Sequence, residues 1–577
     1  MIKKLAGCVR EYLIYTVLSP LFMIAEAVLE VMIPYYLADI VDLGINAGNM
    51  DVVKSVGLKL IFLACCSLAC GIGGGLVAAT ASAGFAKNLQ HDMYYKIQDF
   101  SFSNIDKFST AGLVTRMTTD VTSVQQAFMM FIRMAFRAPT MLVFALIMAF
   151  RVNASLAMTF VYVLPVLIVG LGVMMRTAYP IFGRMFKIYD KLNAVVQENV
   201  RGIRVVKAFV REDLETEKFG SVAKDLYKTN VKAEIIISAG SPIMQFCMYS
   251  CMLLISWTGA HLIVSKTMTT GQLMNTITYI TMILSSLMMF SYMIIMFVIA
   301  GAAAKRITEV LDEVPAIRNP EEPVTLVADG SVSFKDVSFG YGESKDCLEN
   351  INVDIKSGET IGIIGGTGSG KSSLVQLIPR LYDVRGGSVS VGGVDVRSYD
   401  IETLRKSVSM VLQKNVLFSG TISENLRWGN ENATDEEIKH ACELAQAAEF
   451  IESTPGGYER MIEHGGANVS GGQRQRLCIA RALLSRPKIL ILDDSTSAVD
   501  THTEAEILRS FREDIPQITK IIIAQRISSV RDADRIIVMN NGRIDGIGTH
   551  DELLARNVIY REVYESQTKG GDFDALN

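Results

Sequence analysis

Residues 365–372 have the composition and spacing of a loop that binds phosphate groups. They read Gly-Gly-Thr-Gly-Ser-Gly-Lys-Ser and fit the pattern G-x-x-x-x-G-K-[ST] between a strand-like run and a helical run. Glycines let the backbone wrap around phosphates, Lys371 can reach the β- and γ-phosphates, and the Ser372 hydroxyl can face Mg²⁺. A glycine-rich turn without a ligand is the alternative. The candidate nucleotide-binding residues here are Gly365, Gly366, Thr367, Gly368, Ser369, Gly370, Lys371, Ser372 and Ser373.

A second chemical feature is the run Lys-Ile-Leu-Ile-Leu-Asp-Asp at 488–494. It predicts a buried strand that ends in two carboxylates. Asp493 can hold Mg²⁺ through water. A lone aspartate at a strand end is commonly a cap, but a phosphate-binding loop in the same chain favours a metal-binding role.

Between these two motifs, residues 469–476 read Val-Ser-Gly-Gly-Gln-Arg-Gln-Arg. This segment resembles the signature motif of ATP-binding-cassette (ABC) proteins, ordinarily Leu-Ser-Gly-Gly-Gln, with Val469 in first place. The resemblance implies that Ser470, Gly471, Gly472 and Gln473 act on an ATP held by a partner chain. It also implies an adenine-stacking Tyr341, a Gln413 that faces Mg²⁺, a D-loop with Ser497 and Asp500, and a switch position at Gln525.

Two positions depart from the pattern of active family members. The resemblance implies a general-base Glu after the Mg²⁺-linked Asp, but this chain has Asp494, and it has Gln525 where His is usual. The shorter side chain withdraws the carboxylate by about one C–C bond, and a misplacement of ~1 Å can cost a hundredfold in rate. Gln can donate a hydrogen bond but cannot titrate. Together the departures predict a catalytic site that binds ATP and hydrolyses it slowly.

The elements that must carry this site follow a long apolar region. Six apolar runs, each about 20 residues or more, predict membrane-spanning helices. The first lacks a small-residue cleavage site and is longer than the apolar core of a signal peptide. The predicted spans are roughly 14–38, 55–83, 128–150, 154–176, 240–264 and 274–300.

The distribution of Lys and Arg predicts the orientation of these spans. The connections after spans 2 and 4, about 84–127 and 177–239, are long and rich in cations, whereas the other connections are short and hold few. We therefore expect both long connections, both termini and everything after residue 305 to face the cytoplasm. The long connections read as helices prolonged out of the membrane, with bends near 103–106 and 211–213.

The composition changes near Leu311. An acidic, proline-containing segment precedes short β-branched runs that alternate with helical stretches, a pattern typical of an α/β domain. The predicted fold is an α-helical membrane domain of six transmembrane helices with long cytoplasmic extensions, followed by an α/β P-loop nucleotide-binding domain. The predicted boundaries are 1–312 for the membrane domain, 313–330 for the linker, 331–566 for the nucleotide-binding domain and 567–577 for a C-terminal tail.

Two pairs of charged residues lie inside the predicted spans. Glu26 and Glu30 are one helical turn apart in span 1, and Arg133 and Arg137 are one turn apart in span 3. Charges in a membrane normally face the interior of the helix bundle or water. One interpretation is a set of salt bridges that hold helices together. The other is that Glu26 and Glu30 line a cavity and attract cationic substrates.

Composition excludes other classes of protein. The net charge of −4 gives no basic field, so the sequence indicates no nucleic-acid partner. The nine cysteines are an odd number, five of them lie within apolar runs, and they predict buried thiols instead of a disulfide framework. With 50% hydrophobic and 20% charged residues, the chain is too apolar for a soluble enzyme of this size.

Six spans followed by one cassette resemble a half-transporter of the exporter type, and the two departures resemble the degenerate-site subunit of bacterial heterodimeric multidrug exporters. The resemblance implies ATP and Mg²⁺ as cofactors and ATP hydrolysis coupled to export of amphipathic, drug-like compounds. It also implies a lipid bilayer, a multi-pass location in the cell membrane and a second half-transporter with Glu and His at the catalytic positions. A homodimeric exporter, a lipid flippase, an importer on the same architecture and a nucleotide-gated regulator remain alternatives.

Overall fold

The computed structural model describes residues 1–342, 344–496 and 498–574, without some side chains in the membrane helices and at the C-terminus. The chain divides into two units. The membrane unit comprises Met1–Ile97 and Ala111–Asp312, and the cassette unit comprises Gln98–Thr110 and Glu313–Asn577. Each unit is described by itself. The predicted domain boundaries stay predictions.

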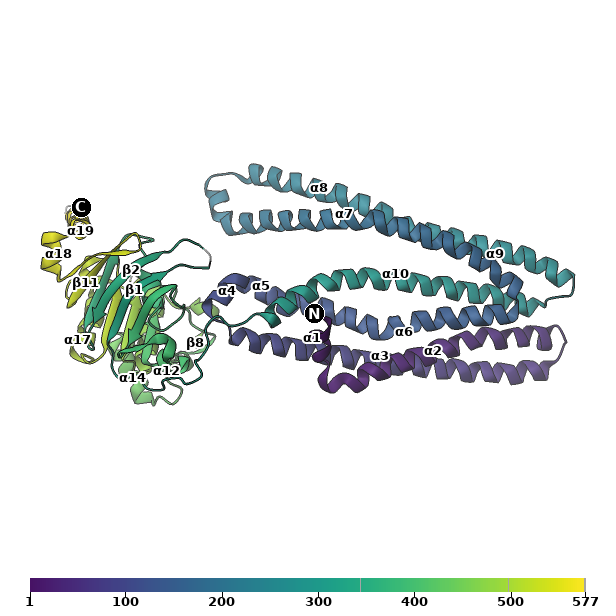
Figure 1. The fold of residues 1–577 in the computed structure, drawn as a ribbon, viewed down its shortest axis with the longest axis horizontal. Coiled ribbons are helices and arrows are strands. Elements are labelled where there is room, and N and C mark those ends of the chain that lie inside the picture. Colours follow the sequence, from purple (N-terminus) through teal and green to yellow (C-terminus); the bar gives the residue numbers. More distant parts are fainter. Residues whose placement is uncertain (343, 497, 575–577) are drawn as a thin grey trace. The chain divides into compact units, whose positions relative to one another are not determined.

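The membrane unit is entirely helical, as its apolar composition predicts (Figure 1). Its elements are α1 (Ile2–Gly7), η1 (Arg10–Tyr12), α2 (Leu13–Asp39), η2 (Ile40–Ile45), α3 (Met50–Gln98), α5 (Thr110–Thr115), η3 (Arg116–Asp120), α6 (Val121–Val152), α7 (Ala154–Ala208), α8 (Glu212–Ser238), α9 (Gly240–Val264) and α10 (Thr270–Asp312).

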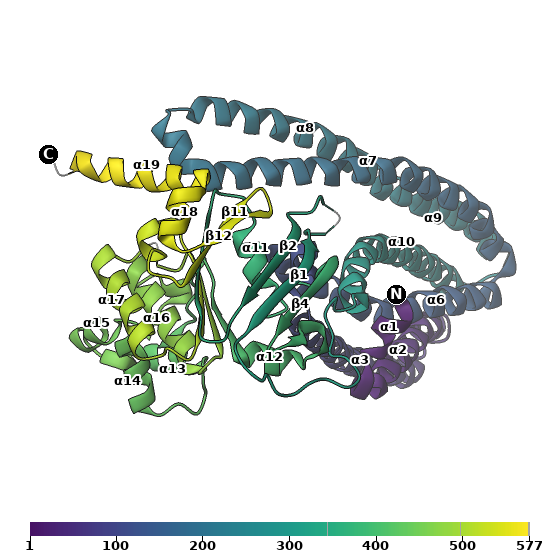
Figure 2. The same ribbon diagram turned by 60° about the vertical axis from the view of Figure 1, so that its left-hand side comes forward.

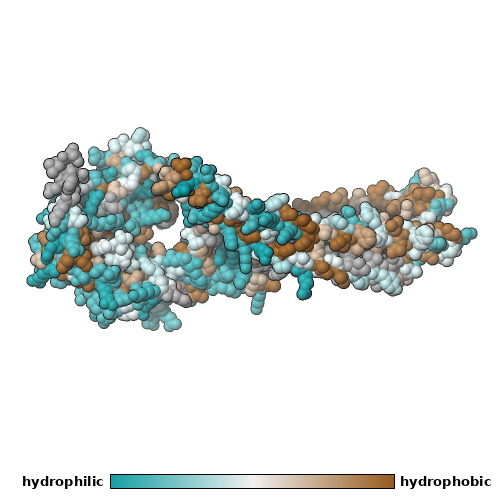
Figure 3. Space-filling model, turned by 90° about the horizontal axis from the view of Figure 1, so that it is seen from above, coloured by the Kyte–Doolittle hydropathy of each residue, from teal (hydrophilic) through white to brown (hydrophobic). Residues whose placement is uncertain are grey.

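Among the described residues, five stretches are long and apolar enough to cross a membrane: Arg10–Ile45, Met50–Gln98, Thr110–Val152, Pro242–Val264 and Thr270–Phe290. They coincide with five of the predicted spans, with an earlier end for the last. The predicted fourth span, 154–176, lies in α7 and includes residues outside the described side chains. Apolar side chains gather on the surface over these helices, which is typical of a surface that faces lipid (Figure 3).

Helix packing in the membrane unit centres on α6, which lies against both α2 and α10. The core between them includes Ala27, Val31 and Ala145, and small residues of this kind let helices approach closely. The buried Tyr279 of α10 donates a hydrogen bond from its hydroxyl to the carbonyl oxygen of Val31 at 3.1 Å. The buried hydroxyl of Tyr279 therefore has its hydrogen-bond partner within the helix interface.

The cassette unit contains a four-stranded antiparallel sheet in the order β2-β1-β4-β5, a six-stranded sheet in the order β12-β11-β3-β10-β9-β6 and a two-stranded sheet β7-β8 (Figure 2). The strands are β1 (Val332–Phe339), β2 (Leu348–Ile355), β3 (Thr360–Gly365), β4 (Gly386–Val391), β5 (Val394–Asp395), β6 (Val408–Val411), β7 (Gly420–Thr421), β8 (Met461–Ile462), β9 (Ile489–Asp493), β10 (Thr519–Ile523), β11 (Arg535–Asn540) and β12 (Arg543–Gly548).

In the six-stranded sheet β11, β3, β10, β9 and β6 are parallel, and only the edge strand β12 is antiparallel. Strands β9 and β10 are buried along their whole length, as their continuous Ile and Leu runs predict. The helices are α4 (Phe102–Phe108), α11 (Lys371–Gln376), η4 (Val396–Ser398), α12 (Ile401–Ser407), α13 (Ile422–Arg427), α14 (Asp435–Leu444), α15 (Ala448–Ser453), η5 (Gly457–Glu459), η6 (His464–Gly466), α16 (Gly471–Leu484), α17 (Thr501–Glu513), η7 (Ile527–Ser529), α18 (His550–Arg556) and α19 (Val558–Asp574).

Helix α4, at the predicted bend of the first long connection, packs within the cassette unit. The buried Asn104 donates from Nδ2 to Glu313 Oε1 at 2.8 Å and to the Val314 carbonyl at 3.1 Å, and its Oδ1 accepts from the Ala316 amide at 3.0 Å. One buried amide side chain therefore binds two backbone groups of the linker.

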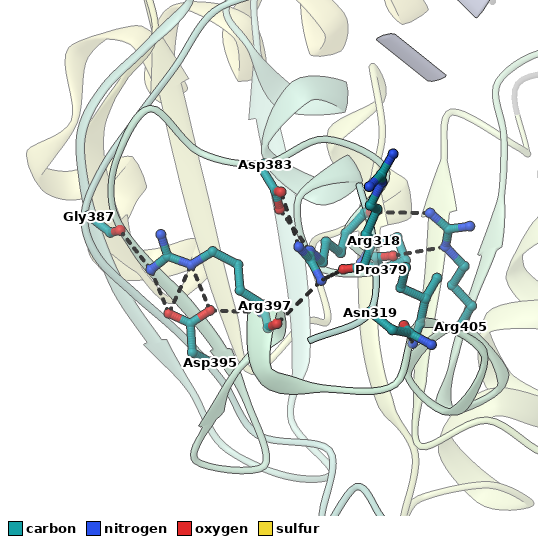
Figure 4. Close-up of polar contacts among 10 residues, drawn as sticks. Arg318, Asn319, Pro379, Asp383, Gly387, Asp395, Arg397 and Arg405 are labelled. Carbon is teal, nitrogen blue, oxygen red and sulfur yellow. Dashed lines mark hydrogen bonds and ion pairs between the residues drawn. The ribbon is translucent and has the colours of Figure 1, made fainter. Parts of the chain in front are cut away.

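The linker is held a second time by Arg380, a buried side chain beyond the phosphate-binding loop (Figure 4). Its guanidinium donates to the carbonyls of Arg318 and Arg397, each at 3.3 Å, and to Asp383 Oδ1 at 2.8 Å. Asn319 donates to Asp400 Oδ1 at 2.7 Å. The segment between the two predicted domains is thus fixed along the cassette by hydrogen bonds.

We expect Asn104→Ala to destabilise the attachment of α4, because it leaves the Ala316 N–H and the Val314 carbonyl without their partner, at a cost of about 1–3 kcal/mol. The readout is the thermal unfolding midpoint of the purified protein together with protease cleavage between residues 98 and 110. Lys107→Ala is the matched control, since it removes a surface ion pair to Glu313, worth about 0–1 kcal/mol, and a cation–π contact with the Phe108 ring, but no partner of a backbone group. Equal effects of both variants would contradict the role of Asn104.

Candidate functional site

The phosphate-binding loop leaves β3 and enters α11, as the sequence predicts. Gly365 has a φ of 156°, and a Cβ atom built there would lie 2.3 Å from the carbonyl oxygen of Met539. Gly370 has a φ of 96°, and a Cβ there would lie 2.7 Å from Leu348 Cδ2. Glycine is therefore required at both positions by backbone conformation and by close approach.

Lys371 lies over this loop. Its Nζ donates to the carbonyl oxygens of Gly365 at 2.7 Å and Gly366 at 2.9 Å. Burial lowers the pKa of Lys371, while the neighbouring Asp494 and Asp493 oppose that shift. These loop carbonyls accept the hydrogen bonds of Lys371. A bound phosphate group would be a stronger, negatively charged acceptor for the same ammonium group.

The residues predicted to hold Mg²⁺ lie beside the loop. The Ser372 hydroxyl donates to Asp493 Oδ1 at 2.9 Å, and burial raises the pKa of the Asp493 carboxyl. Hydroxyl and carboxylate oxygens suit Mg²⁺, and a divalent cation would stabilise the charged form of a buried carboxylate. Among the described residues no three His, Cys, Asp or Glu side chains are arranged to hold a metal. An ion bound here would therefore also need phosphate oxygens and water.

The two positions that depart from the family pattern meet at one carboxylate. Gln525 Nε2 donates to Asp494 Oδ2 at 2.7 Å, and Gln413 Nε2 lies 3.5 Å from the same oxygen. The Asp494 backbone adopts a φ of 49°, and its N–H donates to the carbonyl of Ile523 at 3.0 Å. Asp494, Gln413 and Gln525 thus come from three separate segments and share one polar cluster.

Tyr341 lies at the other side of the loop. Its hydroxyl forms hydrogen bonds with Ser373 Oγ at 2.9 Å and Gln376 Oε1 at 3.2 Å, and burial raises its pKa. Its ring packs edge-on against Tyr382 with the centroids 5.2 Å apart, and the Tyr382 hydroxyl donates to Asp106 Oδ2 of α4 at 2.8 Å. The aromatic group beside the nucleotide loop is therefore in contact with the helix from the first long connection.

The signature segment forms the N-terminus of α16. Ser470 Oγ accepts from the Gln473 amide at 3.2 Å, and Gln473 Oε1 accepts from the Ser470 amide at 3.0 Å, which is a capping box. A Cβ on Gly472 would lie 2.9 Å from the Ala498 carbonyl, so the D-loop packs directly on this segment. Among the described residues, no hydrogen bond joins Ser470–Gln473 to the chain's own phosphate-binding loop.

Of the two predicted D-loop residues, Asp500 caps α17 by accepting from the Thr503 amide at 2.9 Å, and this hydrogen bond lowers the pKa of Asp500. Ser497 lies outside the described residues. The neighbouring Ala498 amide donates to Gln475 Oε1 at 3.0 Å, which ties the D-loop to the signature helix.

Sequence reasoning missed two residues that hold the switch segment. Gln567 of α19 accepts from the Ile527 amide at 2.9 Å and donates to the Gln525 carbonyl at 2.8 Å. The buried Glu504 accepts from Thr496 and Ser529, each at 2.6 Å. The sequence carries no local signal for either contact, because the partners of Gln567 are about forty positions away. Helix α19 continues to Asp574, past residue 567 where the tail is predicted to begin.

The charged residues of the membrane helices lie together in part. Arg137 Nη2 lies 2.9 Å from Glu30 Oε2, and Arg137 Nη1 lies 3.4 Å from Glu26 Oε1. Arg133 has no ion-pair partner among the described residues. Glu26 Oε2 and Arg137 Nε are buried without a hydrogen-bond partner in that same part of the chain. These contacts match the interpretation of salt bridges between helices α2 and α6.

Taken together, an apolar helical unit and an α/β unit with a P-loop, a strand-end carboxylate and a signature helix define a membrane protein driven by a nucleotide. Comparisons with known proteins agree. Residues 16–288 match the ABC transporter transmembrane region, and residues 348–497 match the ABC transporter ATP-binding family.

The chain is 36% identical over 566 residues to "Uncharacterized ABC transporter ATP-binding protein YfiB" of Bacillus subtilis, covering 98% of each protein. It is 35% identical over 428 residues to "Probable multidrug resistance ABC transporter ATP-binding/permease protein YheI" of the same species, covering 74% of this chain and 73% of that protein. The fold matches a solved bacterial Atm1-family ABC exporter with ATP bound, with a TM-score of 0.81 and 23% identity over 97% of this chain and 98% of that one.

This chain belongs to the ABC transporter family, with the fold of an exporter. It is a membrane-spanning protein in which ATP hydrolysis is coupled to transport.

We expect Lys371→Ala to weaken ATP binding at this chain's own loop about ten- to a hundredfold, because it removes a charge-assisted contact to phosphate. The measurement is labelling of the chain by a photoreactive ATP analogue over a range of concentrations. Lys335→Ala, on the exposed side of β1, is the matched control and should label like the unmodified protein. Unchanged labelling of Lys371→Ala would refute the assignment.

Proposed function

We propose that this chain is the non-catalytic half of a heterodimeric ABC exporter for amphipathic, drug-like compounds. Its own site, built on Lys371, binds ATP and hydrolyses it slowly. Its signature residues Ser470 to Gln473 complete a competent site on the phosphate-binding loop of a different subunit that carries Glu and His at the catalytic positions.

The observation that carries this proposal is the contact of Gln525 with Asp494 at 2.7 Å. An amide N–H therefore takes one of the acceptor positions of the carboxylate that stands where active family members carry the general base. Gln525 itself cannot take a proton from the attacking water, because an amide does not titrate near neutral pH. The cluster can therefore order a nucleotide without activating water efficiently.

The signature half of the chain supports the second part of the proposal. The capping box fixes Ser470 and leaves the N–H groups of Gly471 and Gly472 at the helix N-terminus, the arrangement that binds a γ-phosphate. Val469, which departs from the usual Leu, is buried. Its side chain therefore contributes to packing, a role that Val can fill in place of the larger Leu.

The second long connection supports docking onto a partner subunit. Its tip between α7 and α8 exposes Phe209 and Val210, at 72% and 79%. The cassette carries a groove of about 1040 Å³ beside Gln413, whose lining includes the exposed Val416, Phe418 and Trp428. We propose that the tip of each subunit seats in this groove of the other subunit, so that closure of the cassettes moves the membrane helices.

The remaining assignments follow from the same architecture. We propose that Ser372, Gln413 and Asp493 face Mg²⁺ bound with ATP, and that Tyr341 stacks on adenine. The cation-rich connections support a cytoplasmic position for both termini and the cassette. The similarity to YheI, which is named a probable multidrug resistance transporter, supports an amphipathic drug-like substrate.

The two half-sites of this chain should respond very differently to mutation. Asp494→Asn should lower the ATPase rate of the assembled transporter only modestly, because that site already turns over slowly. Ser470→Leu or Gly471→Leu should nearly abolish it, since one misplaced γ-phosphate contact at the competent site costs ~3 kcal/mol, or about a hundredfold. The measurement is the steady-state ATPase rate of the complex with its partner.

Val469→Leu is the matched control for the signature variants, because it restores the usual residue and should keep the rate. If Asp494→Asn is as damaging as the Ser470 change, a homodimer that hydrolyses ATP through Asp494 becomes the better account. Co-purification of a second, different ABC subunit tests the heterodimer directly.

We further propose that Glu26 and Glu30 attract cationic substrates, and that these substrates compete with Arg137 for the two carboxylates. Glu26→Gln or Glu30→Gln should then reduce transport of cationic dyes more than that of neutral dyes, with basal ATPase activity retained. Arg137→Gln should have the opposite effect, because it frees both carboxylates. The measurement is efflux of cationic and neutral dyes from vesicles. Equal losses for both dye classes in all three variants would contradict the proposal and indicate a purely structural salt bridge.

A further inference from the structure

Helices α7 and α8 line a small, open basic cavity in the membrane unit, whose cations are exposed to solvent. Its volume is about 220 Å³, and its lining comprises Pro180, Ile181, Arg184, Lys228, Thr229 and Lys232. Three of these six residues are cations, and no carboxylate is among them. Both helices contribute, so the antiparallel packing of α7 on α8 builds the cavity.

The three cations differ from others on the same helices. Lys207 pairs with Glu212 at 2.9 Å, and Lys218 pairs with Glu198 at 2.8 Å. Arg184, Lys228 and Lys232, in contrast, have no ion-pair or hydrogen-bond partner among the described residues. Three unpaired like charges around one cavity repel one another, and an anion bound between them would remove that repulsion.

The cavity lies where these helices change from polar to apolar. Beyond α8 the predicted fifth span begins at residue 240, eight residues after Lys232 and therefore about 12 Å further along at the rise of an α-helix. On α7 the last apolar residues of the predicted fourth span precede Arg184 by about two turns. Long basic side chains at such a junction reach the headgroup region of a bilayer while their aliphatic stems stay near the apolar surface.

We propose that this cavity binds the phosphate of an anionic lipid headgroup in the leaflet on the cassette side. The choice of leaflet depends on the membrane orientation given under the proposed function. The inference that the cavity binds a phosphate group does not depend on that orientation. Arg184 offers a planar pair of donors, and Lys228 and Lys232 add two point charges. Pro180 and Ile181 supply an apolar wall for the glycerol and the first methylene groups.

The size of the cavity favours a headgroup over a nucleotide. Pockets for drug-sized ligands usually have volumes of about 300–1,000 Å³, and this cavity is smaller. Thr229 does not enlarge the donor set, because its hydroxyl already donates to the Asp225 carbonyl at 2.9 Å. A single phosphate group can contact all three cations, whereas an adenine ring would find no space beside it.

The test measures binding of phosphatidylglycerol and of phosphatidylcholine to the purified full-length transporter by native mass spectrometry. We expect phosphatidylglycerol to bind selectively. Each of Arg184→Gln, Lys228→Gln and Lys232→Gln should weaken that binding about fivefold, the equivalent of about 1 kcal/mol per cation, and the triple variant about a hundredfold. Lys228→Arg and Lys232→Arg keep the charge and should keep the affinity.

A second triple variant, Lys187→Gln, Lys191→Gln and Lys224→Gln, is the matched control. It removes the same charge from the same two helices but none of the cavity lining, so its lipid binding should stay within twofold of the unmodified protein. Equal losses in both triple variants would overturn the site in favour of a general surface potential. A thermal midpoint in lipid-free detergent checks that both variants fold.

Competition with inorganic phosphate distinguishes a lipid headgroup from soluble phosphate as the ligand of this cavity. If millimolar phosphate displaces phosphatidylglycerol and binds as tightly, the cavity is a site for soluble phosphate and the lipid assignment fails. If phosphate leaves lipid binding unchanged, the lipid is the ligand. The readout is binding alone, so a failure of the proposed heterodimer or of the slow site leaves this result interpretable.

Discussion

The nucleotide site depends on the order of three parallel strands. Strand β10 lies between β3 and β9, and the carboxyl ends of parallel strands meet at one edge of a sheet. Lys371 follows β3, Asp493 and Asp494 end β9, and Gln525 follows β10. Hydrogen bonds between the strands fix their register. The sheet therefore brings the backbone of Lys371, of the two aspartates and of Gln525 to the same edge.

That geometry makes the two substitutions a pair. With Gln525 donating to Asp494 at 2.7 Å, a change at either position alters the surroundings of the other. The backbone of the switch segment is held from behind by Gln567 and Glu504, which bind its main-chain and side-chain groups. The two departures from the family pattern therefore lie in a site with a defined structure, held by hydrogen bonds from helices α17 and α19 of the cassette unit.

Contacts within the cassette unit connect this site to helix α4. Asp106 of α4 accepts from Tyr382, Tyr382 packs on Tyr341, and Tyr341 bonds to Ser373 beside the phosphate-binding loop. Burial and the hydrogen bond to Asp106 both raise the pKa of Tyr382, so its hydroxyl stays a donor at physiological pH. A ligand that orders Tyr341 thus acts on groups in direct contact with the first long connection.

The sequence by itself determined the helical membrane region, the phosphate-binding loop, the strand-end aspartates and the signature helix, because each is encoded by residues close together in the chain. Apolar length, glycine spacing and capping residues are local properties that no other part of the protein needs to complete. Only the tertiary structure decided that Gln525 donates to Asp494, that Arg137 lies between Glu26 and Glu30, and that Gln567 holds the switch segment. These contacts join residues about 30 or more positions apart, so their existence depends on the packing of whole helices and strands and not on any local pattern.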